Sequence, residues 1–133
     1  KQIDQISTSM TTITVLLLFV ALQLKHFIVD FPLQLEYQYA NKGTYLHPGG
    51  LLHAGLHGVA TAAILLFATN PLLAIALGLV DALVHYHIDW AKVNINRKHG
   101  WGPTTHAQFW TLLGLDQLLH QLTYVAIIAV LIQ

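Results

Sequence analysis

The sequence predicts an all-α integral membrane protein in which four helices form an up-down-up-down bundle. The chain has 133 residues, of which 55% are hydrophobic and only 9% charged, a balance too apolar for an ordinary soluble domain. Four stretches approach the ~20 mostly apolar residues that a helix needs to cross a bilayer. Within each stretch His and Asp residues recur four apart, which is the spacing of one helix face. These observations predict a single transmembrane domain over residues 1–133.

The expected spans cover about residues 10–31, 50–69, 71–93 and 108–132. Their boundaries coincide with residues that interrupt or cap helices. The first span ends before Pro32, and the second follows the breaker cluster 47–50. Asn70 caps the third span ahead of Pro71, and the irregular segment 100–103 precedes the fourth. The second and third spans should therefore form a tight hairpin.

The orientation follows from the distribution of basic residues. Five of them flank the side that bears the two longer loops: Lys25, Lys42, Lys92, Arg97 and Lys98. Lys1 lies on the other side. The positive-inside rule then predicts cytoplasmic long loops, outer termini and a place in the bacterial inner membrane. The first nine residues are too polar for a signal peptide. A reporter fused to the C-terminus that proved cytoplasmic would refute this orientation.

Composition also limits the partners. The formal net charge is zero and no basic run exceeds two residues, so a nucleic-acid partner is not expected. The absence of Cys excludes disulfides and thiolate metal sites. The expected partners are membrane lipid and, because small residues recur at helical spacing, a second copy of the chain or a larger membrane complex.

Nine side chains carry the four-residue spacing, and each set lies at the same membrane side of its span. They are His26 and Asp30, His53 and His57, Asp81, His85 and Asp89, and Asp116 and His120. In an up-down-up-down bundle all four sets converge. A charged residue at the centre of a membrane helix costs about 2.5–3.5 kcal/mol, and the few nearby bases are not expected to neutralise four carboxylates. Two divalent metal ions would do so, and ligands without sulfur suit Zn²⁺, which we favour, Mn²⁺ or Fe²⁺.

Roles can be assigned within and around this set. Asp30 and Asp89 lie nearest the interface and are candidates for general base or for orienting a ligating imidazole. Five further residues are candidates for binding an anionic group such as phosphate: Lys25, Gln34, Lys92, Arg97 and Lys98. The simpler interpretation of the four basic residues is that they set topology and extend to lipid headgroups. Thr61 and Tyr124 continue the same helix faces.

The other histidines have more ordinary interpretations. His47, His99 and His106 lie beside Pro or Gly or at a helix start, which indicates solvated or capping side chains. His87 points away from the face of Asp81 and His85, so we expect it to bond to a neighbouring helix.

Four ordered segments resemble a family of short bacterial and phage membrane proteins of unknown function: His26–Gln34, Leu52–His57, Asp81–Lys92 and Asp116–His120. The resemblance covers nearly the whole chain and implies the membrane fold and the His–Asp pattern, but no reaction. More remotely, the arrangement is similar to membrane-bound metal-dependent hydrolases, which are also small helical bundles with His and Asp near the interface.

The favoured hypothesis is a metal-dependent hydrolase that acts on a lipid-linked or phosphorylated amphipathic substrate at the cytoplasmic leaflet. A metal-ion transporter is an alternative, although the far halves of the spans are almost without polar groups and a transporter needs a path to both sides. A haem-binding bundle would leave the Asp residues unexplained. A fourth alternative is a structural membrane subunit that metal merely holds together. Metal uptake into proteoliposomes would favour the transporter, and a Soret band would favour the haem-binding bundle. Unfolding on metal removal, without loss of any catalytic activity, would favour the structural subunit.

Overall fold

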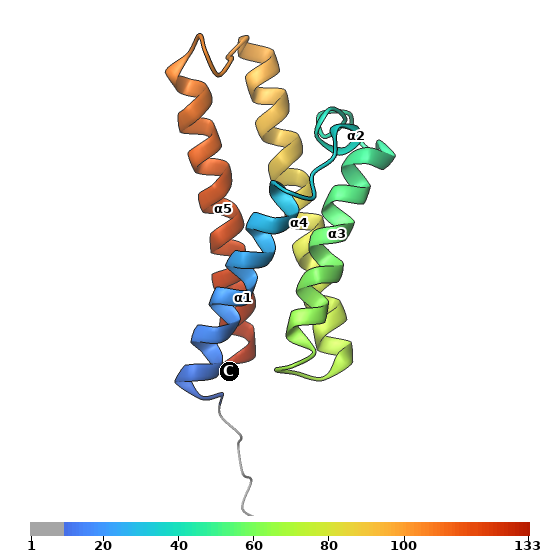
Figure 1. Ribbon diagram of the computed structural model, residues 1–133, viewed down its shortest axis with the longest axis vertical. Coiled ribbons are helices and arrows are strands. Elements are labelled where there is room, and N and C mark those ends of the chain that lie inside the picture. The colour runs from blue at the N-terminus through green and yellow to red at the C-terminus, as the bar shows by residue number, and fades with distance from the viewer. Residues whose placement is uncertain (1–9) are drawn as a thin grey trace, which may run out of the picture.

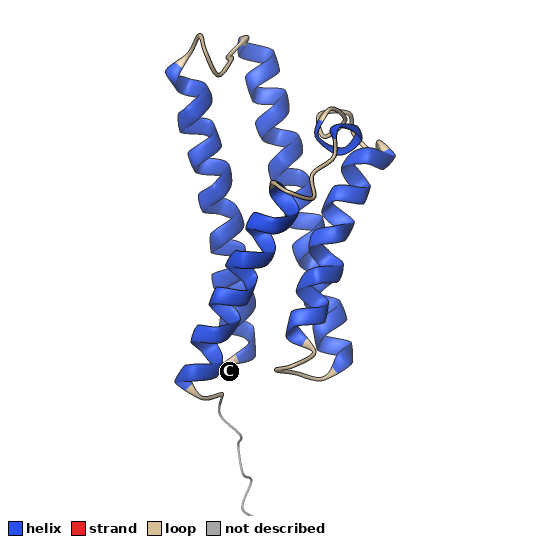
Figure 2. Cartoon of the chain, in the orientation of Figure 1, coloured by secondary structure: helices blue, strands red, loops and turns tan. Residues whose placement is uncertain are grey.

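The computed structural model describes residues 10–133 and consists of helices and the loops between them (Figure 2). Four helices are long and one is short: α1 (Thr12–Asp30), α2 (Glu36–Tyr39), α3 (Pro48–Leu65), α4 (Pro71–His99) and α5 (Ala107–Leu131). The expectations for Lys1 and for the polar first nine residues lie outside the described part of the chain. The short helix α2 was not expected, and it lies in the connection between α1 and α3.

Three of the long helices, α1, α4 and α5, are long and apolar enough to cross a membrane. The fold is therefore all-helical and consistent with a membrane protein. Helix α3 is shorter, and the polar residues that it carries, including His53 and His57, lower its mean hydropathy. It nevertheless exposes large apolar side chains, such as Leu52 and Val59.

Consecutive long helices run in opposite directions (Figure 1). The α3–α4 pair packs most extensively, α4 also packs against α5, and α1 contacts both α3 and α5. One end of the molecule therefore gathers the end of α1, the start of α3, the end of α4 and the start of α5, together with α2 (Figure 1). This is the end at which the sequence places the His and Asp residues.

Several helix boundaries differ from the sequence prediction, most of all the end of α3, at Leu65 in place of about 69, and the end of α4, at His99 in place of about 93. Helix α3 begins at Pro48 because the His47 Nδ1 atom caps it by accepting a hydrogen bond from the backbone N–H of Gly49 at 3.0 Å, and proline suits the first helical position. Helix α4 continues past Val93 to His99 and ends at Gly100, which has a left-handed φ of 66°. Hydropathy alone ended this helix too early, because its last turns are polar but contain no residue that breaks a helix.

Apolar side chains fill the opposite half of the molecule. The buried core there consists of Leu18, Leu22, Leu65, Ala74, Leu77, Tyr124, Ile127 and Ile128. Beside it α3 and α4 approach so closely that a Cβ atom on Gly58 would lie 2.7 Å from the backbone oxygen of Gly78. The α3–α4 contact therefore depends on glycine at this position.

Replacing Gly58 by Ala should destabilise the protein by about 1–3 kcal/mol, because the added methyl group overpacks the α3–α4 contact. The matched change on the same helix is Gly55→Ala, where an added Cβ meets nothing within 4 Å. That variant should be neutral or slightly more stable, since Ala is the better helix former. Unfolding in mixed micelles, followed by circular dichroism, measures both. Equal stabilities of the two variants would contradict the close packing described here.

Candidate metal centre

The nine His and Asp side chains that the sequence singles out are buried inside the molecule. Each is at most 6% exposed, and they come from α1, α3, α4 and α5. Their imidazole rings are packed tightly, with ring centroids 3.6 Å apart for His57 and His85 and 4.0 Å apart for His85 and His120. The structure thus brings together residues that are far apart in the sequence, such as His26 and His120, whose ring centroids lie 5.1 Å apart.

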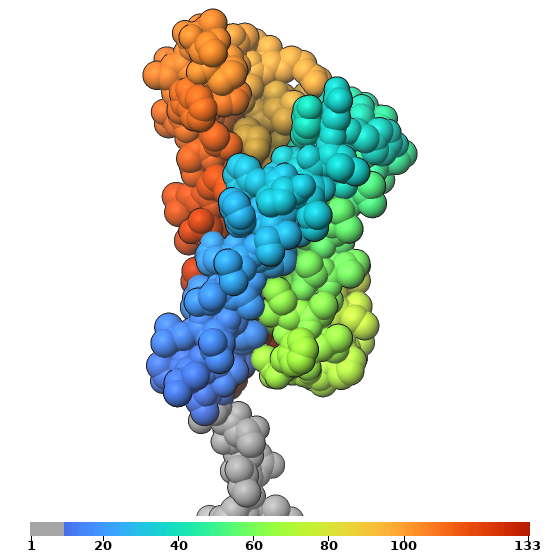
Figure 3. Space-filling model, in the orientation of Figure 1, coloured from blue at the N-terminus to red at the C-terminus, as the bar shows by residue number. Residues whose placement is uncertain are grey.

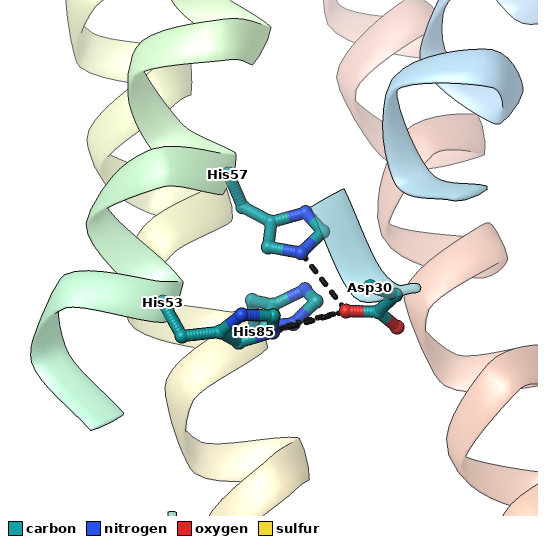
Figure 4. A group of neighbouring side chains, drawn as sticks. All are labelled: Asp30, His53, His57 and His85. Atoms are coloured by element: carbon teal, nitrogen blue, oxygen red, sulfur yellow. Dashed lines mark hydrogen bonds and ion pairs between the residues drawn. The ribbon is translucent and has the colours of Figure 1, made fainter. Parts of the chain in front are cut away.

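Four of these residues form the most compact group. Figure 4 shows three imidazoles directed at one carboxylate oxygen, the Oδ1 atom of Asp30 at the end of α1. The Nε2 atoms of His53 and His57 lie 3.0 Å from this oxygen. The Nε2 atom of His85 lies 3.4 Å from it and 3.2 Å from the Nε2 atom of His53. Four ligand atoms therefore surround one point.

These separations suit a four-coordinate ion. With metal–ligand distances of about 2.0–2.2 Å, a tetrahedral Zn²⁺ ion holds its ligand atoms about 3.3–3.5 Å apart. The ligand atoms of Asp30, His53, His57 and His85 all lie within 4.8 Å of one another. The group could therefore hold a metal ion after small side-chain adjustments.

A second, adjacent group consists of His85, Asp89 and His120. The Nε2 atom of His85 lies 3.3 Å from Oδ2 of Asp89, and the Nε2 atom of His120 lies 3.4 Å from Oδ1 of Asp89. Four buried atoms of this group make no hydrogen bond within the described residues: His85 Nδ1, Asp89 Oδ1, Asp89 Oδ2 and His120 Nε2. Buried polar atoms without hydrogen bonds are costly unless charges compensate them, so this group is a second candidate ligand site.

Lysines pair with three of the four buried carboxylates. The Nζ atom of Lys25 lies 2.9 Å from Asp81 Oδ2, and that of Lys42 lies 2.7 Å from Asp89 Oδ2. The Nζ atom of Lys92 lies 3.0 Å from Asp116 Oδ2 and 3.6 Å from Asp89 Oδ1. Among the described residues, Asp30 is the one buried Asp whose ion-pairing partners are all histidines: His26, His53, His57 and His85.

These pairs differ from the sequence expectation that nearby bases are too few. The sequence indicates Lys42 only as a topology determinant. Nothing in the irregular connection between α1 and α3 predicts that this side chain reaches Asp89. Lys25 is 6% exposed and donates to Asp81 and to the hydroxyl of Tyr124, so it neither extends to headgroups nor faces an open substrate site. The carboxylates are therefore compensated largely by the protein itself.

A hydrogen-bonded network lies beside the compact group. His26 Nε2 lies 3.1 Å from Asp30 Oδ2 and 2.9 Å from Gln117 Oε1, while its Nδ1 atom lies 2.9 Å from the Tyr124 hydroxyl. The Lys25 ammonium lies 3.2 Å from Nδ1 of His57. The contacts of His26 orient the Asp30 carboxylate that faces an ion. The Lys25 ammonium can only donate to Nδ1 of His57, so ligation through His57 Nε2 requires Lys25 to be neutral or to turn away. Gln117 was not singled out, because it lies off the four-residue spacing.

The Asp81 carboxylate also belongs to the surroundings of the compact group. It accepts from the hydroxyl of Thr61 and from Lys25, and it belongs to neither group of ligand atoms. The expectation that Thr61 and Tyr124 continue the polar faces is confirmed by these contacts and by the bonds of Tyr124 to Lys25 and His26.

The remaining predicted residues are dispersed. Gln34 donates to the backbone oxygen of Asp30, whereas Arg97 and Lys98 are exposed in the last turn of α4, away from both ligand groups. His99 is also exposed and stacks on Trp101, with ring centroids 4.6 Å apart.

The other histidines make some of the contacts expected from the sequence, which were helix capping and, for His87, a bond to a neighbouring helix. His47 caps α3, as described above. His106 occupies the cap position of α5 but makes no capping hydrogen bond, and its Nδ1 atom lies 2.8 Å from Thr105 Oγ1. The Nε2 atom of His87 lies 3.2 Å from the hydroxyl of Tyr45. Its partner is therefore in the α1–α3 connection and not on a neighbouring helix.

The fold and the site define an all-helical protein with candidate membrane spans and buried His–Asp groups that could hold a metal ion. The chain belongs to the family described as protein of unknown function (DUF3307), which matches residues 18–133. The match includes every residue of both candidate ligand groups. No curated protein and no solved structure matches the chain.

Replacing Lys25 by Met should destabilise the protein by about 3–5 kcal/mol, because it leaves the buried Asp81 carboxylate without its ammonium partner. The double variant Lys25→Met/Asp81→Asn should recover part of this loss, since the unpaired charge is then gone. Lys98→Met, at an exposed position, is the matched control and should have little effect. Unfolding in mixed micelles measures all three, and a Lys25→Met variant as stable as Lys98→Met would refute the buried pair.

Proposed function

We propose that this protein is a membrane-embedded metalloprotein, and that its metal centre hydrolyses a lipid-linked or phosphorylated amphipathic substrate. The single observation that carries the proposal is the convergence of three imidazoles on one buried carboxylate oxygen, Asp30 Oδ1. In this proposal α3 is the fourth transmembrane segment, and the four long helices form an up-down-up-down bundle in the bacterial inner membrane. The ligand groups lie toward the cytoplasmic leaflet, where the positive-inside rule puts the long loops.

The ion is held in this proposal by Asp30, His53, His57 and His85. One carboxylate with three imidazoles is a donor set typical of Zn²⁺, and Mn²⁺ or Fe²⁺ also accept it. We favour Zn²⁺ because the ligand atoms are close enough for four-coordination. His26 and Asp81 act indirectly, through Asp30 and through Lys25 beside His57.

The lysine pairs bear on the number of ions. Two divalent ions would balance four uncompensated carboxylates. Three of the four carboxylates, however, pair with Lys25, Lys42 and Lys92. One divalent ion is then sufficient, and a second would add excess positive charge to a buried site, which is costly. We therefore propose one ion, with the neighbouring group of His85, Asp89 and His120 as the place of a second only if those lysines turn away.

The chemistry follows from the positions of the remaining groups. A bound ion would supply Lewis-acid chemistry at a phosphoryl or carbonyl oxygen and would activate a water molecule. Asp89 Oδ2 lies 3.3 Å from His85 Nε2 and 3.4 Å from His53 Nε2, close enough to accept a proton beside the ion as general base. Asp30, the other sequence candidate for this role, faces the three imidazoles and is better suited to ligation.

Two alternatives meet specific obstacles in the structure. A transporter needs a polar path on both sides of its site, but the apolar core of Leu22, Leu77, Ile127 and their neighbours fills the far half. A haem needs open space beside its axial imidazole, but the rings of His57, His85 and His120 stack on one another at 3.6 and 4.0 Å. A purely structural metal centre is separated from the hydrolase by the turnover experiment below.

Metal content tests the proposed ion directly. Purified wild-type protein should contain about one transition-metal ion per chain, and Asp30→Asn or His57→Ala should remove it, because a four-ligand site rarely survives the loss of a ligand. His87→Ala is the matched control, since His87 contacts Tyr45 outside both groups. Elemental analysis provides the measurement. His120→Ala distinguishes one ion from two, because His120 belongs only to the second group: it should leave a content near one unchanged but would lower a content near two.

Turnover tests the hydrolase. On a panel of phospholipids and polyprenyl phosphates, Asp89→Asn should lower the rate by about 10²–10⁴-fold, the usual contribution of a general base, while the metal content persists. His57→Ala should abolish both turnover and metal content. Product release measured by thin-layer chromatography would follow the reaction. Metal-loaded wild-type protein that releases no more product than His57→Ala would reject the hydrolase and leave a structural metal centre.

A further inference from the structure

A cavity of about 320 Å³ opens beside the ligand groups, between α4, α5 and the connection from α1 to α3. In Figure 3 this region lies where the surface is hollowed between the orange start of α5 and the blue-green connection. Its lining is mixed: Gln34, Tyr39, Lys42, Lys92, Val93, Asn96, Phe109 and Leu113. Two ammonium groups and two amides in one cavity form a polar site at the edge of a largely apolar molecule.

The polar groups of this cavity retain unused hydrogen-bonding capacity. The Lys42 ammonium has three donors but contacts a single carboxylate oxygen among the described residues, Asp89 Oδ2. The side-chain oxygens of Gln34 and Asn96 are buried and accept no hydrogen bond within residues 10–133. The cavity therefore offers cationic donors for an anion and open acceptors for a hydroxyl group.

An apolar groove begins at the same lysine. A hollow of about 530 Å³ between α4 and α5 is lined mainly by aliphatic side chains, including Leu83, Ile88 and Leu115, and also by Lys92 and Asp116. Lys92 lines both the groove and the polar cavity. The two spaces therefore adjoin at Lys92, one suited to a hydrocarbon chain and the other to a charged head.

We infer that the cavity and groove together bind one anionic lipid with a phosphate and a hydroxyl-bearing headgroup. The phosphate lies between Lys42 and Lys92, which donate charge-assisted hydrogen bonds. The hydroxyl groups donate to Gln34 and Asn96, and the chain occupies the groove between α4 and α5. A glycerophospholipid with a glycerol headgroup has this combination of charge, donors and chain.

This inference refines the proposed function, and it rests on that function only in treating the bound lipid as substrate. Lys42 contacts Asp89 at 2.7 Å, and Asp89 lies 3.3 Å from Nε2 of His85. The headgroup would therefore be bound one residue away from the proposed ion. Binding itself requires neither the ion nor turnover, so the two proposals can fail separately.

Native mass spectrometry of the protein, released from maltoside micelles, tests the inference. Lysophosphatidylglycerol and lysophosphatidylcholine of equal chain length are added at equal mole fraction, with and without EDTA. The two lipids share the chain and the phosphate and differ in headgroup charge and hydroxyl groups. We expect about tenfold higher occupancy by lysophosphatidylglycerol, because its headgroup brings hydroxyl groups for Gln34 and Asn96 and no cation beside the two lysines. Free glycerol 3-phosphate, the third arm, should bind much more weakly because it lacks the chain.

Two pairs of variants locate the binding site. Asn96→Asp adds a negative charge to the cavity without changing its shape and should remove the preference for lysophosphatidylglycerol. Its control, Gln108→Glu, adds the same charge at an exposed position near the start of α5. Ala91→Trp should block the groove that Ala91 lines and lower the occupancy of both lipids about tenfold, since a buried chain segment is lost. Its control, Ala63→Trp, fills the separate groove between α1 and α3.

Neither Asn96 nor Ala91 takes part in an ion pair, so both variants should fold, and their thermal unfolding verifies this. Equal occupancy by the two lysolipids in the wild type would overturn the anionic headgroup site. Equal binding of free glycerol 3-phosphate would overturn the role of the groove, and an unchanged preference in Asn96→Asp would overturn the location. A protein that binds lysophosphatidylglycerol as described but hydrolyses no lipid would refute only the proposed function.

Discussion

The structure depends on the neutralisation of four Asp side chains buried among apolar helices. A carboxylate in such surroundings is costly unless charges or hydrogen bonds compensate it. Three of them pair with lysines: Asp81 with Lys25 of α1, Asp89 with Lys42 of the α1–α3 connection, and Asp116 with Lys92 of α4. Asp30 is compensated by histidines. Apart from the His26–Asp30 contact within α1, each of these contacts joins two segments of the chain, so the polar interior also fixes how the segments pack.

This polar interior occupies one half of the molecule, and hydrocarbon side chains occupy the other. The division follows from the alternating directions of the long helices, which bring the polar ends of all four together (Figure 1). It gives the protein a polar interior at one end and an apolar core in the other half. A one-sided polar interior is better suited to chemistry at one membrane surface than to a pathway across the membrane.

The polar interior has two kinds of surroundings. On one side Lys25, Tyr124 and Thr61 close the network with hydrogen bonds and leave little room for a ligand. On the other side Lys42 and Lys92 separate the carboxylates from a cavity. The first arrangement stabilises and orients the imidazoles, and the second would, in the proposed lipid complex, give the phosphate access to charged donors. A lysine paired with an Asp therefore has a structural role where the network is closed, as at Lys25, and a proposed ligand-binding role where a cavity adjoins it, as at Lys42 and Lys92.

The sequence by itself determined the helices and the nine buried side chains, because hydropathy and four-residue spacing are local properties of a helix. It also indicated that those side chains meet at one end. Only the tertiary structure decided that Lys42 reaches Asp89 and that Lys25 turns inward to Asp81. It likewise decided which four ligand atoms face one another. These contacts join residues far apart in the chain through irregular connections and helix rotations, for which the spacing of residues carries no signal.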